Sequence, residues 1–229
     1  MNETTLPRTA PLLWDLDGTL VDTGRDLARA VNRMLVEYGY PELPEATVIS
    51  HVGKGARNLV TRSLEEYAHT LPDDAAASRA LASFERHYAT CLLDTTQPYP
   101  GIPELLSDLA QAGRPMAVVT NKPQHFSERI LAALDLAGAF RFILGEGVLP
   151  TRKPDPEPLL HALRHCAPEV PAHRVILIGD SWVDVQAARN ARMRSCAVAW
   201  GLGVPQDARD EGPDWWIETV PELRALLGL

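Results

Sequence analysis

The sequence is poor in lysine and has no long hydrophobic run. Only three of its 22 basic residues are lysines, no block of basic residues occurs, and the formal net charge is -8. This charge balance argues against nucleic acid or an anionic membrane as the main partner. No apolar run approaches the roughly 18 residues that a membrane-spanning helix needs. We therefore expect neither a nucleic-acid-binding protein nor a membrane protein.

Cysteine is also scarce. The three cysteines, Cys91, Cys166 and Cys196, are odd in number and far apart. This spacing fits neither a disulfide framework nor a C-x-x-C metal site. The first residues lack a basic region followed by an apolar stretch, which argues against a signal peptide. A cytoplasmic protein with reduced thiols is the prediction.

Short apolar runs that end in polar or turn residues recur along the chain. They predict buried strands over 11–15, 116–120, 140–144, 174–179, 196–200 and 215–219. The runs are continuous rather than alternating, as expected for a parallel sheet covered on both faces. Helical patterns lie between them, for example over 101–113 and 155–166. The predicted fold class is therefore α/β, with a doubly wound, Rossmann-like parallel sheet.

The interval between the first two predicted strands is much longer than one crossover needs. Three helical patterns fill it, at 26–39, 55–68 and 75–93. They predict a small α-helical cap domain inserted into the core. The predicted domains are a catalytic core of residues 1–20 and 95–229 and a cap of residues 21–94. The links at 20–23 and 94–101 would form a hinge.

Two aspartates, Asp15 and Asp17, end the first predicted strand. Residues two apart on a strand face the same side, so both carboxylates would project at the carboxyl edge of the sheet, where open α/β folds bind ligands. Carboxylates so close raise each other's pKa unless a cation lies between them. Mg²⁺, which prefers oxygen ligands, would relieve this repulsion, although an acidic turn before Gly18 would give the same pattern.

Polar residues follow two further strand predictions. Thr120 and Asn121 end the second strand, where a hydroxyl and backbone amides suit a phosphate oxygen. The alternative is that they cap and turn the chain before Pro123. Lys153 lies in a proline-rich loop that would present it at low entropic cost, or would leave it solvated.

The fourth predicted strand ends in Asp180, and Asp184 follows in the first turn of a helix. Ser181 and Asp184 also have the spacing of a capping box, so Asp184 has a purely structural alternative. Together, the four strand ends resemble the haloacid dehalogenase superfamily of phosphohydrolases. The motifs are DLDGT at 15–19, Thr120, Lys153 and GDSWVD at 179–184, and the similarity spans essentially the whole chain, cap included.

The resemblance implies a Mg²⁺-dependent phosphatase that acts through an aspartyl-phosphate. Asp15 would be the nucleophile and Asp17 the general acid and base. The implied phosphate-binding residues are Thr120, Asn121 and Lys153. The implied metal ligands are Asp15, the backbone carbonyl of Asp17, and Asp180, with Asp184 as a further ligand or a neighbour of one. Dehalogenases of the superfamily lack an acid/base aspartate at the position of Asp17, so dehalogenation is disfavoured.

The cap stretch HVGKGARNLV at 51–60 places glycines on both sides of Lys54, and Arg57 at a helix start. Lys54 or Arg57, with the helix amides, would bind a second anion, or both would be solvated beside a glycine turn. The other two lysines of the chain lie in motif loops, which favours a function for Lys54. With VVTNKP and YPGIPELLSDL, the stretch is similar to the phosphoglycolate phosphatase branch, whose substrate carries a phosphate and a carboxylate.

The predicted substrate is therefore 2-phosphoglycolate, a small phosphorylated metabolite. The alternatives are another small phosphate ester, a phosphonoacetaldehyde hydrolase with Lys54 as Schiff-base nucleophile, and a sugar phosphomutase that shares the core motifs. A receiver-like phospho-switch is disfavoured, because such modules need no inserted cap. The sequence leaves open the role of His51 and the choice between monomer and homodimer.

Overall fold

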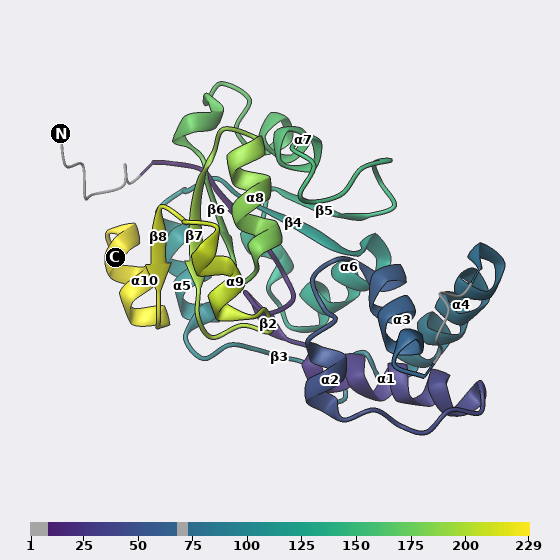
Figure 1. Ribbon diagram of the computed structural model, residues 1–229. Coiled ribbons are helices and arrows are strands. Elements are labelled where there is room, and N and C mark those ends of the chain that lie inside the picture. Colours follow the sequence, from purple (N-terminus) through teal and green to yellow (C-terminus); the bar gives the residue numbers. More distant parts are fainter. Residues whose placement is uncertain (1–8, 68–72) are drawn as a thin grey trace.

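A sheet of six parallel strands forms the centre of the core (Figure 1). The computed structural model describes residues 9–67 and 73–229. The strands of this sheet are β1 (Leu12–Trp14), β4 (Met116–Pro123), β5 (Phe142–Glu146), β6 (Ile176–Gly179), β7 (Arg194–Val198) and β8 (Trp215–Ile217). They lie in the order β5-β4-β1-β6-β7-β8, and every neighbouring pair is parallel. The predicted parallel sheet is confirmed.

Helices cover both faces of this sheet. They are α5 (Ile102–Gln111), α6 (Gln124–Ala133), α7 (Glu157–Cys166), α8 (Trp182–Asn190), α9 (Pro205–Asp210) and α10 (Val220–Leu227), with short 3₁₀ turns at Ala137–Ala139 and Ala172–Arg174. Leu13 of β1 packs in one hydrophobic cluster with α7 and α8, whereas Leu12 and Trp14 pack in another with α5, α6 and α10. Because neighbouring strand residues are buried on opposite faces, the strands read as continuous apolar runs.

Between Asp22 and Gln97 the described residues form four helices, and Figure 1 shows them beside the core. They are α1 (Gly24–Glu37), α2 (Glu45–Ile49), α3 (Ala56–Glu65) and α4 (Asp74–Cys91). The predicted helical insertion is confirmed. The helix expected over 55–68 ends as α3 at Glu65, and residue 68 lies outside the described residues. The domain boundaries at 20/21 and 94/95 stay a prediction.

The two links between the insertion and the core run side by side. Val21–Asp22 (β2) pairs antiparallel with Gln97–Pro98 (β3). Asp26, fully buried in the first turn of α1, accepts hydrogen bonds from the backbone N–H and the hydroxyl of both Thr95 and Thr96, at 2.7 to 3.1 Å. Burial raises the pKa of Asp26, but these donors outweigh it and hold the pKa below its usual range. One carboxylate thus joins the first turn of α1 to the link that returns to the core.

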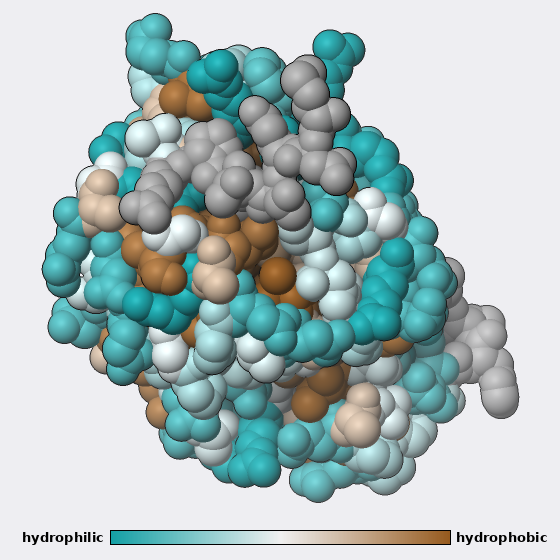
Figure 2. Space-filling view, turned by 90° about the vertical axis from the view of Figure 1, so that its left-hand side faces the viewer, coloured by the Kyte–Doolittle hydropathy of each residue, from teal (hydrophilic) through white to brown (hydrophobic). Residues whose placement is uncertain are grey.

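Within residues 9–67 and 73–229, no helix combines the length and the hydropathy needed to cross a bilayer. The face in Figure 2 is mostly hydrophilic, with hydrophobic residues in small groups.

Replacing Asp26 by alanine should lower the free energy of unfolding at pH 7 by roughly 3 kcal/mol, because four donors, two of them on the buried Thr96, lose a charged acceptor. Urea denaturation measures this difference. Since the folded-state pKa of Asp26 is lowered, its contribution is present above the unfolded pKa of about 4 and is lost as the pH falls through the folded pKa. The difference in unfolding free energy between the wild type and Asp26→Ala should therefore become smaller as the pH is lowered. Asp210→Ala, at an exposed site, is the control; equal stability of the two variants would contradict the linking role of Asp26.

Candidate active site

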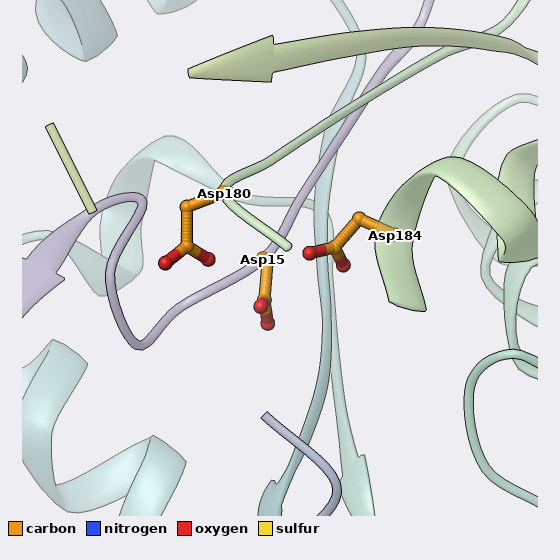
Figure 3. A group of neighbouring side chains, drawn as sticks. All are labelled: Asp15, Asp180 and Asp184. Carbon is orange, nitrogen blue, oxygen red and sulfur yellow. The ribbon is translucent and has the colours of Figure 1, made fainter. Parts of the chain in front are cut away.

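Three buried carboxylates meet at the carboxyl ends of β1 and β6. Asp15 follows β1, Asp180 follows β6, and Asp184 lies in the first turn of α8. One oxygen from each lies within 4.8 Å of the others. Figure 3 shows Asp15 between Asp180 and Asp184, with the three carboxylates turned toward a common space. The structure thus brings together three acidic residues that the sequence predicted for a metal site.

One lysine opposes these three negative charges. Lys153 Nζ lies 3.0 Å from Asp15 Oδ1 and 2.6 Å from Asp184 Oδ1, and its side chain is only 1% exposed. Burial raises the pKa of Asp15 to about 6 despite Lys153, and burial with the charges of Asp184 and Asp15 raises the pKa of Asp180 to about 8. With all groups ionised, the cluster carries two uncompensated negative charges. A hard divalent cation with oxygen ligands fits this donor set.

Short-range contacts fix the acidic residues. Asp180 Oδ2 accepts hydrogen bonds from the backbone N–H groups of Leu202 and Gly203, at 2.7 and 2.8 Å. At Gly18, where φ is +80°, a Cβ atom would lie 2.1 Å from the same oxygen, so the DLDGT turn requires glycine here. The turn therefore approaches Asp180 more closely than any side chain would allow.

Asp184 combines the two roles that its sequence position suggested. Its Oδ2 accepts hydrogen bonds from the hydroxyl and the backbone N–H of Ser181, which completes the capping box of α8. Its Oδ1 is the atom that pairs with Lys153. The capping box of α8 therefore orients the Asp184 carboxylate toward Lys153. A metal contact of Asp184, as a ligand or beside one, stays a prediction.

Asp17 turns away from the three-carboxylate cluster. Its Oδ1 accepts hydrogen bonds from Thr23 Oγ1 at 2.6 Å and from Lys122 Nζ at 3.0 Å. The carboxylate lines a cavity together with Asp15 and Thr120. The two neighbouring aspartates thus have different surroundings, which allows them different chemical roles. The predicted metal contact of the Asp17 carbonyl stays a prediction.

Asn121, on β4, connects two loops through its side-chain amide. Its Oδ1 accepts a hydrogen bond from the Lys153 N–H at 2.9 Å, and its Nδ2 donates to the carbonyls of Lys153 and Gly53, at 2.9 and 3.2 Å. Gly53 lies in the helical insertion. Asn121 therefore joins the Lys153 loop of the core to the insertion. Phosphate binding by Asn121 and Thr120 stays a prediction.

The cavity beside Asp15 and Asp17 has a volume of about 40 Å³. It lies between the core and the helical insertion, and both contribute to its walls. Its apolar lining comes from Leu27, Val52, Ala56, Leu59, Phe84, Pro123 and Phe126. Among the described residues that line it, Lys122 is the one cationic side chain.

The two cap cations predicted from sequence lie elsewhere. Lys54 is exposed, with its Nζ 4.7 Å from the centroid of the Trp182 ring, and it lines a separate cavity of about 290 Å³. Arg57 is exposed and donates a hydrogen bond to Ser78 Oγ at 2.8 Å. Neither lines the cavity beside Asp15. A role for them in anion binding stays a prediction.

Sequence reasoning did not place Lys122 among the site residues. Lys122 Nζ lies 3.0 Å from Asp17 Oδ1, and its side chain is only 3% exposed. The available signal is the scarcity of lysine: the buried Lys122 and Lys153 are two of the three lysines in the chain.

The chain is similar to known proteins over nearly its full length. Residues 12–198 match the family model described as haloacid dehalogenase-like hydrolase. A phosphoglycolate phosphatase of Nitrosospira multiformis is 40% identical, with 97% of this chain and 96% of that protein covered. One from Cupriavidus necator is 39% identical, with 99% and 96% covered. The crystal structure of a predicted phosphoglycolate phosphatase from Haemophilus somnus has a TM-score of 0.88 at 27% identity, with 96% and 98% covered.

Replacing Lys153 by methionine should destabilise the fold by roughly 3–5 kcal/mol, because it leaves buried carboxylates without their cation. Chemical denaturation in EDTA measures this loss. Lys54→Met removes an exposed lysine that contacts one ring, and should cost less than about 1 kcal/mol. Equal, small losses of unfolding free energy in Lys153→Met and Lys54→Met would contradict the role of Lys153 in balancing the charge of the buried carboxylates.

Proposed function

The chain belongs to the haloacid dehalogenase-like hydrolases and is a phosphatase similar to the phosphoglycolate phosphatases, and we propose that it hydrolyses 2-phosphoglycolate to glycolate and phosphate with Mg²⁺. The observation that carries the proposal is the pair Asp15 and Asp17. One carboxylate belongs to the cluster of three buried carboxylates, and the other lines a cavity with a lysine beside it. This arrangement would supply a nucleophile and a proton donor for one reacting phosphate.

In the first step, an Asp15 carboxylate oxygen attacks the phosphorus atom. A bond from phosphorus to Asp15 forms as the bond from phosphorus to the glycolate oxygen breaks, and Asp17 gives that oxygen its proton. Lys153 Nζ, 3.0 Å from Asp15, is placed to reduce the negative charge that opposes the attack of one anion on another. Thr120 lines the same cavity and would donate its hydroxyl to a phosphate oxygen.

In the second step, water hydrolyses the aspartyl-phosphate. Asp17, now ionised, takes a proton from the water as its oxygen attacks phosphorus, and the bond to Asp15 breaks. Inorganic phosphate leaves and the Asp15 carboxylate is restored. The buried position of the site, between the core and the helical insertion, would limit competing access of water during the first step.

The proposed Mg²⁺ ligands are Asp15, Asp180 and the carbonyl of Asp17, with Asp184 beside them. Their oxygen atoms and their excess negative charge fit a hard divalent cation. When bound, the ion would screen the anionic nucleophile from the anionic substrate.

Two observations favour 2-phosphoglycolate over the alternative substrates. A phosphonoacetaldehyde hydrolase would need an uncharged lysine amine in the cavity to form a Schiff base. Lys54 contacts Trp182 and does not line the cavity, and the Lys122 ammonium that does line it is paired with Asp17. The name shared by the two relatives at 40% and 39% identity supports the same choice.

A phosphate-release screen over small phosphoesters tests the substrate. The value of kcat/KM should be at least roughly tenfold higher for 2-phosphoglycolate than for glucose phosphates or for phosphonoacetaldehyde. Asp15→Asn should lower turnover by roughly 10³-fold or more with the fold intact, because the amide is a poor nucleophile. Retained turnover in this variant would contradict the aspartyl-phosphate mechanism, and a preferred sugar phosphate would contradict the substrate.

Metal binding is tested by thermal unfolding. At about 100 times its dissociation constant, Mg²⁺ should stabilise the protein by roughly 2.7 kcal/mol, which raises the Tm by roughly 5–10 °C at this chain length. Asp180→Asn should lose most of this shift, whereas the exposed control Asp210→Asn should keep it. An unchanged Mg²⁺ shift in Asp180→Asn would argue against the acidic cluster as the metal site.

A further inference from the structure

The proposed proton donor is held in place by residues on both sides of the core–cap boundary. Thr23, at the start of α1, donates a hydrogen bond to Asp17 Oδ1 at 2.6 Å. Lys122, which follows Thr120 and Asn121 on β4, reaches both Asp17 oxygens, at 3.0 and 3.2 Å. Asp17 therefore has restricted freedom to turn its carboxylate.

Lys122 is itself held by a residue of the helical insertion. Its Nζ donates to the hydroxyl of Tyr88 on α4 at 2.7 Å and lies 4.6 Å from the centroid of the Tyr88 ring. Taken as whole residues, Lys122 is 5% exposed and Tyr88 is 1% exposed. A hydrogen bond and a cation–π contact from one aromatic side chain thus fix the ammonium group. Asp17, Lys122 and Tyr88 form a continuous chain from the core to α4.

The ring of Tyr88 is fixed from two directions. Phe84, one turn earlier on α4, stacks on it with ring centroids 5.5 Å apart. Phe126 of α6, in the core, contacts it edge-on at 5.0 Å. The position of Tyr88 therefore depends on α4 being packed against the core. Burial and the charge of Asp17 raise the pKa of Tyr88 well above its usual value, so the hydroxyl stays neutral and the charge of Lys122 is directed to Asp17.

We propose that Lys122 and Tyr88 are positioning residues for Asp17, and that proton donation to the leaving group reaches its full rate only when α4 is docked on the core. The inference rests on the proposed phosphatase function. Lys122 acts by holding Asp17 mainly through Oδ1, which leaves Oδ2 to carry the proton that is donated, and Tyr88 acts by holding Lys122. The contact couples closure of the cavity to completion of the proton-donating group.

The geometry favours this role over recognition of the substrate's carboxylate. The Lys122 ammonium already donates to Asp17 and to the Tyr88 hydroxyl, and it is almost fully buried. A substrate carboxylate would compete with Asp17 for the same charge. Because Lys122 is also the cationic side chain of the cavity wall, the experiment must separate the two roles.

Three substrates of similar size make that separation. 2-Phosphoglycolate has an alkoxide leaving group and a carboxylate. 2-Hydroxyethyl phosphate has the same kind of leaving group without the carboxylate. Acetyl phosphate releases acetate, which needs no proton from the enzyme. Because kcat/KM reports only the steps up to formation of the aspartyl-phosphate, it isolates the step in which Asp17 acts as an acid.

Lys122→Met should lower kcat/KM by about 100-fold for both alkyl phosphates and by less than about threefold for acetyl phosphate, since a general acid contributes about 10²–10⁴-fold. Tyr88→Phe, which keeps the ring and removes the hydroxyl, should show the same pattern at about five- to tenfold. The matched control is Tyr67→Phe, which removes a hydroxyl that bonds to the Glu42 carbonyl within the helical insertion. It should change none of the three values by more than about twofold. Tm values establish that each variant is folded.

The other outcomes overturn the inference. A loss confined to 2-phosphoglycolate would make Lys122 a carboxylate ligand. Equal losses on all three substrates would indicate a general structural role. Unchanged kcat/KM values in Tyr88→Phe would contradict the proposed coupling to α4, and this result would hold even if Lys122→Met were unfolded. The substrate proposal has its own test: it is contradicted if the wild-type enzyme hydrolyses 2-phosphoglycolate no faster than 2-hydroxyethyl phosphate. In that case the comparison of 2-hydroxyethyl phosphate with acetyl phosphate still decides the role of Lys122.

Discussion

The repulsion among three buried carboxylates is the constraint on which the rest of the site depends. Asp15 and Asp184 share one lysine, Lys153, and Asp180 lies beside them, so a divalent cation would balance the remaining charge of the cluster. Such a group is costly to bury unless every member is oriented by further hydrogen bonds. The capping box of α8 and the backbone N–H groups at Asp180 provide that orientation, and Gly18 leaves the space for it. Strand ends, turn glycines and a helix cap thus serve one electrostatic requirement.

The segment from Thr120 to Lys122 connects this cluster to the rest of the molecule. Thr120 faces the cavity, Asn121 holds the backbone of the Lys153 loop, and Lys122 holds Asp17. Asn121 and Lys122 also contact the helical insertion, at Gly53 and Tyr88. Three consecutive residues therefore join the proposed phosphate site, the charge balance and the cap.

The sequence predicted the sheet and the meeting of Asp15 with Asp180, because both follow from short-range rules. Apolar runs give the strands, and parallel strands bring their carboxyl ends to one edge, so Asp15 and Asp180 had to meet. The cap residues were harder to predict. Glycines around Lys54 indicated a loop near the site but could not give the direction of the side chain, which depends on its packing against Trp182. Lys122 was missed because its partner Tyr88 is distant in sequence and belongs to another part of the fold.

The placement of Lys122 also bears on why the cap and the core belong to one chain. A cap that only covered the cavity would need shape and apolar surface, which Leu27, Leu59 and Phe84 provide. A cap that places a hydroxyl on the lysine beside the proposed acid does more, because closure then affects reactivity as well as access. A leaving group too large for the cavity would hold α4 away and weaken proton donation at the same time. Selection by size and selection by rate would then have a common structural origin.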